Sequence, residues 1–349
     1  MLSTRLAAVD PLQPEQAVID QAADIIKSGG LVAFPTETVY GLGADGLNDA
    51  ASRRIFAAKG RPADNPLILH IADVQEVDRL VKRIPANAAA LMQEFWPGPL
   101  TVVLERCDII PDAVTAGLDT VAIRLPGSLI ARRLIQAAGV PIAAPSANAS
   151  GRPSPTTAQA VLFDLAGKVE MILDGGPCEV GLESTVVDCT TPVPTLLRPG
   201  GVTREMLLAV LGELELDKNL LDQESAPRSP GMKYKHYAPA APMALVDAEP
   251  AERGAILTRE VSQALDAGKR VGAVVSAETA VLLPEAVCVA VYGSRSNKQQ
   301  IAGSLYECLR QFDDFPVDVI FGEGVDEAGV GLAIMNRLRK AAGYRIITE

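Results

Sequence analysis

Three polar motifs follow or interrupt apolar runs, which is where α/β proteins commonly place ligand-binding groups. Residues 34–43 (FPTETVYGLG) leave a buried-looking strand and enter a glycine-rich turn that can present hydroxyl and backbone N–H groups. Residues 59–66 (KGRPADNP) place a lysine and an arginine around a tight turn. Lysine can bind phosphate as a point charge, and the forked guanidinium of arginine can bind two phosphate oxygens at once. Residues 143–154 (AAPSANASGRPS) form a hydroxyl-rich loop. Together the motifs predict a small-molecule site.

Each motif also has an ordinary structural explanation. The first can be a turn whose Thr and Glu side chains bond the local backbone, and the second can be a helix C-terminus, where cations favour the helix dipole. The third can simply end a strand, because Ser, Asn, Gly and Pro are common loop residues. Taken singly, the motifs therefore do not decide the function.

Several polar side chains stand inside or at the ends of apolar strands. Arg124 lies within VAIRLP, where an unpaired guanidinium is costly to bury, so it is expected to meet a carboxylate or a phosphate. An internal salt bridge is the structural alternative. Arg198 and residues 183–185 (EST) can be read in the same two ways. His70 closes the run PLILH, where a lone histidine is more often a satisfied edge residue than a catalyst.

Sequence patterns disfavour several function classes. No GxxxxGK[ST], GxSxG or HExxH sequence occurs, which argues against a P-loop, a nucleophile elbow and a zincin helix. Five scattered cysteines and two histidines supply neither a disulfide framework nor a transition-metal site, so no protein metal ligand is assigned. A net charge of −11 and an aromatic content of 4% oppose a broad nucleic-acid-binding surface.

The hydropathy pattern indicates a cytoplasmic protein with no membrane partner. No run of eighteen apolar residues is present, and residues 1–16 reach Asp10 and Pro11 before a signal-type apolar region can form.

The elements that must position these motifs alternate between helical and strand patterns over residues 1–211. Helices are predicted at 14–30, 49–59, 73–82, 86–95, 128–138, 156–165 and 203–211. Strands are predicted at 31–35, 66–71, 100–104, 120–125, 141–144, 169–174, 184–189 and 194–198. No clear helix joins strands 100–104 and 120–125, so a twisted mixed sheet is expected rather than a parallel one.

Residues 212–241 lose this periodicity and contain SPGMKYKHYAP, which indicates a linker. Its basic and aromatic residues 233–237 can close over a nucleotide as a lid. Short apolar runs separated by helical patterns at 257–268, 297–313 and 327–342 then predict a small doubly wound, Rossmann-like α/β domain at 242–349. No GxGxxG follows its first strand, so no dinucleotide is assigned.

The ordered set FPTETVYGLG, KGRPADNPLILHI, FWPGPLT, VAIRLP, APSANASGRPSPT, DGG, ESTVVD and LLRPG resembles the YrdC-like family over residues 12–212. With the SPGMKYKHYAP segment and the second α/β domain, the chain is similar to the two-domain threonylcarbamoyl-AMP synthases of that family. The resemblance implies a concave site on a twisted mixed sheet, where L-threonine, bicarbonate and ATP give threonylcarbamoyl-AMP and pyrophosphate. A partner tRNA threonylcarbamoyl transferase would then form threonylcarbamoyladenosine at position 37; direct tRNA binding stays open.

The resemblance also implies roles for individual residues. The threonine pocket would use Thr38, His70, Arg124, the Ala144 backbone and Ser184. The ATP site would use Lys59, Arg61, Asn65, Thr120, Ser146, Asn148, Ser154, Arg198 and Tyr237, with Mg²⁺ accompanying ATP and no tightly bound organic cofactor. Catalysis would depend on Lys59, Arg61, Arg124 and Ser146.

Two other functions remain to be weighed against the synthase. A noncatalytic RNA-binding protein of the same fold is disfavoured by the acidic charge and the few aromatic residues. An adenylating or carbamoyl-transferring enzyme of the hydrogenase-maturation type would carry additional zinc-finger-like and acylphosphatase-like segments, which do not occur in this sequence. No residue presents itself as a dedicated general base, although His70 has suitable chemistry.

Overall fold

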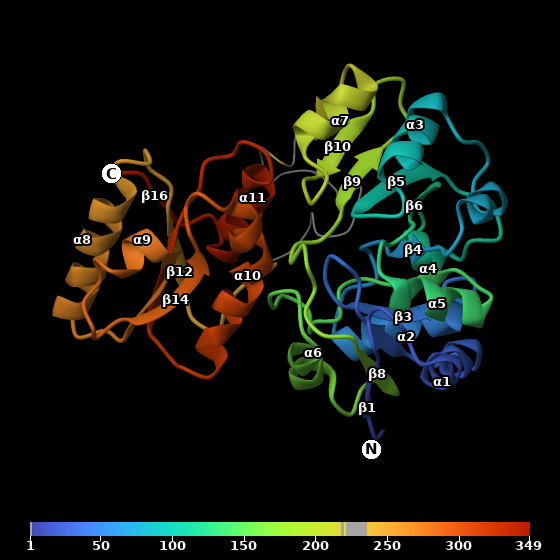
Figure 1. Ribbon diagram of the computed structural model, residues 1–349, viewed down its shortest axis with the longest axis horizontal. Coiled ribbons are helices and arrows are strands. Elements are labelled where there is room, and N and C mark those ends of the chain that lie inside the picture. Colours follow the sequence, from blue (N-terminus) through green and yellow to red (C-terminus); the bar gives the residue numbers. More distant parts are fainter. Residues whose placement is uncertain (1, 218–219, 221–235) are drawn as a thin grey trace. The chain divides into compact units, whose positions relative to one another are not determined.

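The computed structural model describes residues 2–217, 220 and 236–349, which divide into two compact units (Figure 1). Among these residues, the first unit holds 2–150, 155–179, 183–217 and 220, and the second holds 151–154, 180–182 and 236–349. Most of the predicted linker at 212–241 lies outside the described residues. The linker, its role as a lid and the domain boundaries therefore stay predictions.

The first unit is built on a mixed sheet, as the sequence predicted. Its strand order is β1-β8-β2-β3-β7-β4-β6-β5-β9-β10-β11. The strands are β1 (Arg5–Ala8), β2 (Val32–Phe34), β3 (Gly41–Asp45), β4 (Ile68–His70), β5 (Leu100–Glu105), β6 (Thr120–Arg124), β7 (Ile142–Ala143), β8 (Met171–Asp174), β9 (Thr185–Asp188), β10 (Thr195–Arg198) and β11 (Glu215–Leu216). The sheet contains parallel pairs such as β4 with β6 and antiparallel pairs such as β5 with β6.

Helices cover this sheet and supply its core. They are α1 (Gln16–Lys27), α2 (Asp49–Lys59), the 3-10 helix η1 (Val74–Arg79), α3 (Ala86–Phe95), α4 (Asp112–Thr115), α5 (Leu129–Ala138), α6 (Ala158–Leu165) and α7 (Arg204–Leu211). Helices α1 and α5 lie side by side (Figure 1), and their apolar faces share one buried cluster with β2 and β8. Local signals set the ends of α2: the Asn48 side chain accepts from Ala51 N–H, and Gly60 adopts a left-handed φ of 62°.

The prediction of a glycine-rich turn after Phe34 was wrong in part, because residues 41–45 form strand β3 antiparallel to β2. At Gly43, a Cβ atom would lie 2.7 Å from both Ile142 Cγ2 and Phe34 Cε1. The glycine therefore permits close packing within the sheet instead of a turn. The predicted helix at 73–82 is the shorter η1, which starts with a capping box between Asp73 and Glu76.

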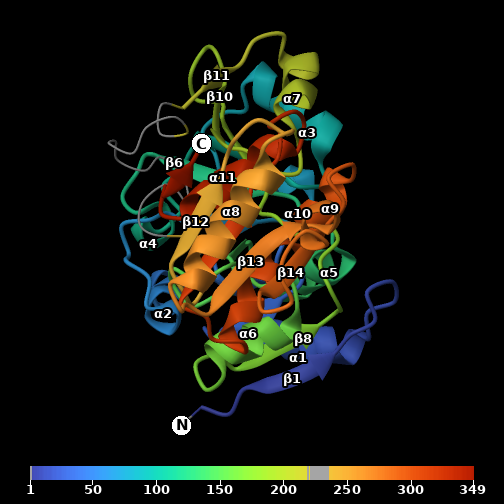
Figure 2. The ribbon, with the colours of Figure 1, turned by 90° about the vertical axis from the view of Figure 1, so that its left-hand side faces the viewer.

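The second unit is a doubly wound domain, as predicted. All neighbouring strands are parallel, in the order β14-β13-β15-β12-β16. The elements are β12 (Met243–Val246), α8 (Arg253–Asp266), β13 (Val271–Ser276), α9 (Ala277–Ala280), β14 (Cys288–Gly293), α10 (Lys298–Arg310), η3 (Gln311–Asp313), β15 (Val319–Glu323), α11 (Gly331–Ala341) and β16 (Ile346–Ile347). Helix α8 covers one face, as Figure 2 shows, and α10 and α11 lie on the other.

Candidate active site

Arg124 forms the first polar cluster, at the end of β6. Parallel pairing places it opposite His70, the last residue of β4. The guanidinium is buried; its Nη1 donates to Thr38 Oγ1 at 2.9 Å and its Nε donates to the Gly98 carbonyl at 3.2 Å. The structure thus brings together three of the residues expected to bind threonine.

Glu37 completes this cluster, and the sequence analysis did not assign it. Its Oε1 lies 2.7 Å from Arg124 Nη2 in an ion pair, although the two groups are not aligned as a hydrogen bond. Burial alone would raise the pKa of Glu37, but the positive charge of Arg124, together with the backbone N–H of Gly127, outweighs that effect and lowers it. This pair is the internal salt bridge that the sequence analysis kept as the structural alternative for Arg124, so binding of a ligand carboxylate or phosphate by Arg124 stays a prediction. The signal was available, because Glu37 stands inside the FPTETVYGLG motif.

His70 is held as a neutral imidazole. Its Nδ1 lies 3.2 Å from the Ile68 carbonyl, which can only accept, so Nδ1 carries the proton and Nε2 is left as an acceptor. Burial, followed by the positive charge of Arg124, lowers the pKa of His70 to about 3. A group with so low a pKa is a weak general base at neutral pH, but it can accept a hydrogen bond from a hydroxyl group.

Lys59 organises the second cluster from the last turn of α2. Its buried ammonium donates to the backbone carbonyl of Ser146, to the carbonyl of Asn148 at 2.5 Å and to Asn148 Oδ1 at 3.4 Å. Ser146 Oγ in turn donates to Asn148 Oδ1 at 2.5 Å. The lysine charge therefore lies against the loop at residues 146–148, and three predicted nucleotide-binding residues meet.

Backbone contacts join the first two clusters. Ala147 N–H donates to the Tyr40 carbonyl at 2.8 Å, and Ala144 N–H donates to the Ile68 carbonyl at 2.9 Å. The second bond has a consequence for the predicted threonine pocket. Because its N–H is occupied, Ala144 would have to contact a ligand through its carbonyl.

Ser184 and Arg198 form the third cluster, at neighbouring ends of β9 and β10. Arg198 Nε donates to the Ser184 carbonyl at 3.0 Å, and Arg198 Nη2 donates to Ser184 Oγ at 3.1 Å. Thr101 Oγ1, which the sequence analysis did not single out, lies 2.7 Å from Ser184 Oγ. One predicted threonine ligand and one predicted ATP ligand are thus in direct contact.

The segment at residues 97–101 connects the first and third clusters. Gly98 contributes its carbonyl to Arg124, Pro99 accepts from Thr185 N–H at 2.9 Å, and Thr101 reaches Ser184. The motif FWPGPLT therefore links the first and third clusters through these hydrogen bonds.

The remaining predicted residues are less closely gathered. Arg61 Nη2 donates to the carbonyls of Asn65 and Pro66, at 3.0 and 3.1 Å, and the buried Oδ1 of Asn65 has no hydrogen-bond partner within the part of the chain that the structure describes. Thr120 begins the strand that Arg124 ends, so the two lie four positions and roughly 13 Å of strand apart.

Ser154 and Tyr237 belong to the second unit. There the buried Tyr237 ring stacks on Tyr306 with centroids 5.4 Å apart, and the Arg337 guanidinium lies 5.8 Å from the centroid of Tyr237. Of the predicted lid cluster, only His236 and Tyr237 lie within the described residues.

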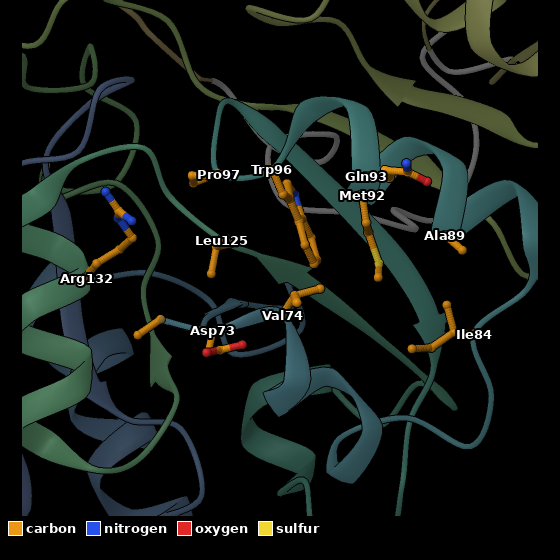
Figure 3. Close-up of a pocket in the computed structure, with 11 residues that line it drawn as sticks. Asp73, Val74, Ile84, Ala89, Met92, Gln93, Trp96, Pro97, Leu125 and Arg132 are labelled. Atoms are coloured by element: carbon orange, nitrogen blue, oxygen red, sulfur yellow. The ribbon is translucent and has the colours of Figure 1, made fainter.

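An apolar pocket of about 570 Å³ lies on the first unit, and Figure 3 shows its lining. Met92, Trp96, Leu125 and Arg132 face it, whereas none of the predicted site residues lines it. Its wall includes the residues directly before Gly98 and directly after Arg124, so the pocket adjoins the first cluster along the chain.

Two absences concern only the residues that the structure describes. Over residues 2–217, 220 and 236–349, no three His, Cys, Asp or Glu side chains gather in a way that could hold a metal ion. Over the same residues, no helix combines the length and apolar character needed to cross a bilayer.

Comparisons with known proteins cover nearly the whole chain. The family described as "Telomere recombination" (Sua5, YciO and YrdC) matches residues 24–200, and that described as "Threonylcarbamoyl-AMP synthase, C-terminal domain" matches residues 202–343. The threonylcarbamoyl-AMP synthase of Bacillus subtilis is 50% identical, over 97% of this chain and 96% of the relative. That of Pyrococcus abyssi is 47% identical, over 95% and 96%. The crystal structure of P. abyssi Sua5 complexed with L-threonine superposes with a TM-score of 0.93, at 46% identity and 99% coverage of each chain.

Proposed function

The chain belongs to the threonylcarbamoyl-AMP synthase family and makes threonylcarbamoyl-AMP from L-threonine and ATP; we propose that it does so as a nucleotidyltransferase, with bicarbonate supplying the carbamoyl carbon. The product serves the threonylcarbamoyladenosine modification of tRNA. A separate transferase would consume it, in the cytoplasm where tRNA and ATP are found. The relatives give no support to the noncatalytic RNA-binding alternative.

The meeting of Arg124, Thr38 and neutral His70 is the observation that carries the proposed threonine site. A guanidinium fork suits a carboxylate, because it can form two parallel hydrogen bonds. With Nδ1 protonated, the Nε2 of His70 has the lone pair that can accept from the hydroxyl of threonine, and the Thr38 hydroxyl already accepts from Arg124. Amino-acid carboxylate and hydroxyl would thus be read by neighbouring groups at the ends of β4 and β6.

The reaction then needs two bond-forming steps. The threonine amine attacks the carbon of bicarbonate, and the amine proton leaves with the departing hydroxide as water, which gives an N-carboxylate. From CO₂ the same N-carboxylate forms with loss of a proton and without release of water. An oxygen of this carboxylate attacks the α-phosphorus of ATP, and pyrophosphate leaves with the electron pair of the broken P–O bond. Both reactants of the second step are anions, so fixed positive charge and orientation must lower the barrier.

Cationic groups of this chain match that requirement. Arg61, Arg198 and the loop that Lys59 holds would contact the nucleotide, with Ser146 and Asn148 orienting phosphate oxygens. Lys59 would act partly through the loop, because its ammonium already donates to the carbonyls there. Binding of Asn65, Thr120, Ser154 and Tyr237 to ATP is part of the same proposal.

Mg²⁺ would arrive as part of the ATP substrate and neutralise its phosphate oxygens. The neutral hydroxyl and amide oxygens at residues 146–148 are of the ligand type that Mg²⁺ accepts beside phosphate and water. Mg²⁺ bound through phosphates keeps several water ligands and needs few protein ligands.

The products of ATP turnover distinguish nucleotidyl transfer from hydrolysis. Purified protein with ATP, Mg²⁺, bicarbonate and L-threonine should release pyrophosphate, and omission of threonine should abolish the release. Formation of ADP and phosphate, or pyrophosphate release indifferent to threonine, would contradict the proposal. Salt-dependent binding to RNA without any turnover would favour the RNA-binding alternative instead.

A further inference from the structure

Glu37 is a buried carboxylate beside the proposed threonine site that the reaction scheme does not use. Its Oε1 lies 2.7 Å from Arg124 Nη2, and its Oε2 lies 3.4 Å from the backbone N–H of Ser128, just before α5. A Cβ atom on Gly127 would approach Glu37 Cδ to 3.3 Å, so the chain closes tightly around the carboxylate. Glu37 is therefore held from two sides.

The segment behind Glu37 is itself fixed. Ser128 caps α5 by accepting from Ala131 N–H at 3.3 Å, and its hydroxyl donates to the Pro35 carbonyl at 3.0 Å. This second bond ties the start of α5 to the segment that carries Glu37. The N-terminus of α5 also favours a negative charge through the helix dipole.

The contacts of Arg124 leave donors available for a ligand. Gly98 engages Nε, Thr38 engages Nη1 and Glu37 attracts Nη2. A guanidinium carries five N–H groups, so N–H groups remain on both terminal nitrogens. The three contacts fix the plane of the fork, and rotation of the side chain would break all of them.

We propose that Glu37 is a positioning residue for threonine: it locks the Arg124 guanidinium in the orientation that receives the substrate carboxylate, without touching the reacting atoms. The inference rests on the proposed role of Arg124. Its physical basis is that a pre-oriented fork loses less conformational freedom when the ligand binds. Without Glu37, the Arg124 guanidinium would lose conformational freedom only when threonine binds, and this entropic cost would weaken the binding of threonine.

The first test is Glu37→Gln, which keeps the size of the side chain and removes its charge. In steady-state assays of pyrophosphate release, we expect the KM for threonine to rise about tenfold or more, because loss of one oriented ionic contact is on that scale. The KM for ATP and kcat at saturating threonine should stay within about twofold. Glu37→Asp retains the charge on a shorter arm and should recover part of the affinity.

A matched control is Glu105→Gln. Glu105 pairs with Arg83 at 3.0 Å in the same unit, but Arg83 is largely exposed and Glu105 partly exposed, so loss of this solvent-screened pair should leave both KM values unchanged. Thermal denaturation and ATP binding of Glu37→Gln establish that the variant is folded. If it fails to fold, Glu37→Asp takes its place in the tests below.

A double-mutant cycle on L-threonine binding, measured by calorimetry without turnover, separates positioning from direct contact. If Glu37 acts through Arg124, Glu37→Gln should change the Kd for threonine less than about twofold in an Arg124→Lys background. An equal loss of affinity in both backgrounds would overturn the inference. Failure of the proposed function looks different: wild-type protein would then form no threonine-dependent pyrophosphate.

Discussion

The ammonium of Lys59, at the end of α2, lies 2.5 Å from the backbone carbonyl of Asn148, 89 residues further along the chain. It also donates to the Ser146 carbonyl, so one side chain holds two positions of the hydroxyl-rich loop. The same lysine is buried and therefore cannot be treated as a mobile surface cation. Lys59 is best understood as the group that gives the loop both its shape and its positive field.

Replacing Lys59 tests this dual role. Lys59→Met should lower kcat about tenfold to a hundredfold, because misplacement of orienting groups has effects of that size. Lys59→Arg keeps the charge but cannot place a compact ammonium between two carbonyls, so it should rescue poorly. Lys27→Met is the control, since Lys27 is an exposed partner of Asp24. Full activity of Lys59→Met in pyrophosphate release would refute the role.

Arg124→Lys should affect threonine more than ATP. A lysine retains the charge in a buried position but loses the planar fork that contacts Gly98, Thr38 and Glu37. We expect the KM for threonine to rise by about tenfold to a hundredfold, equivalent to about 1.4–3 kcal/mol. The KM for ATP should change little. A larger change for ATP than for threonine would place Arg124 in the nucleotide site instead.

His70 makes the stability of the first unit depend on pH. Its pKa is about 3 in the folded chain and 6.5 for the free side chain, so between these values the unfolded state binds more protons. The contribution of His70 to the free energy of unfolding is therefore fully present above pH 6.5 and is lost progressively as the pH falls from 6.5 towards 3. Relative to pH 7.5, the loss at pH 5 should be about 2 kcal/mol.

Urea unfolding can measure this loss through Trp96, the single tryptophan, which lies in the first unit. The free energy of unfolding of wild type should fall more steeply with decreasing pH than that of His70→Gln, which cannot titrate. Parallel pH profiles for the two proteins would mean that His70 is not held neutral.

Gly200→Ala should destabilise the third cluster. A Cβ atom there would lie 2.4 Å from the Glu183 carbonyl oxygen and from Thr185 N, both backbone atoms that cannot move aside cheaply. We expect a loss of about 1–3 kcal/mol in unfolding free energy, together with weaker substrate binding. Gly254→Ala, where the nearest contact is an ordinary 3.4 Å, is the control. A thermally unchanged Gly200→Ala would show that the backbone at β9 and β10 is less tightly packed.

Elements fixed by local signals could be predicted from the sequence. Helix α2 was placed correctly because Asn48 or Asp49 was expected to cap its start; Asn48 is the cap, and the helix ends at Lys59 before Gly60. Strands β1 and β16 were missed, since each is short, incompletely buried and formed by pairing with a distant parallel strand. Pairing of this kind produces no clear hydropathy pattern within the short segment itself.

The site residues could be predicted as candidates, but their partners could not. A buried Arg124 was expected to meet a carboxylate or a phosphate, yet it lies 87 positions from Glu37 in the sequence, and only the folded sheet shows that the two meet. The phosphate role suggested for Lys59 likewise gave no indication of its bonds to residues 146–148. The charge and burial of a side chain predict that it has a partner, but the topology of the sheet determines which residue that partner is.

The most direct test of the central claim follows the carbon of bicarbonate into the product. Purified protein with ATP, Mg²⁺, L-threonine and ¹³C-bicarbonate should give threonylcarbamoyl-AMP that carries one ¹³C by mass spectrometry, with one pyrophosphate per adenylate. Consumption of ATP without a labelled adenylate, or a product that forms equally well without threonine, would contradict the account.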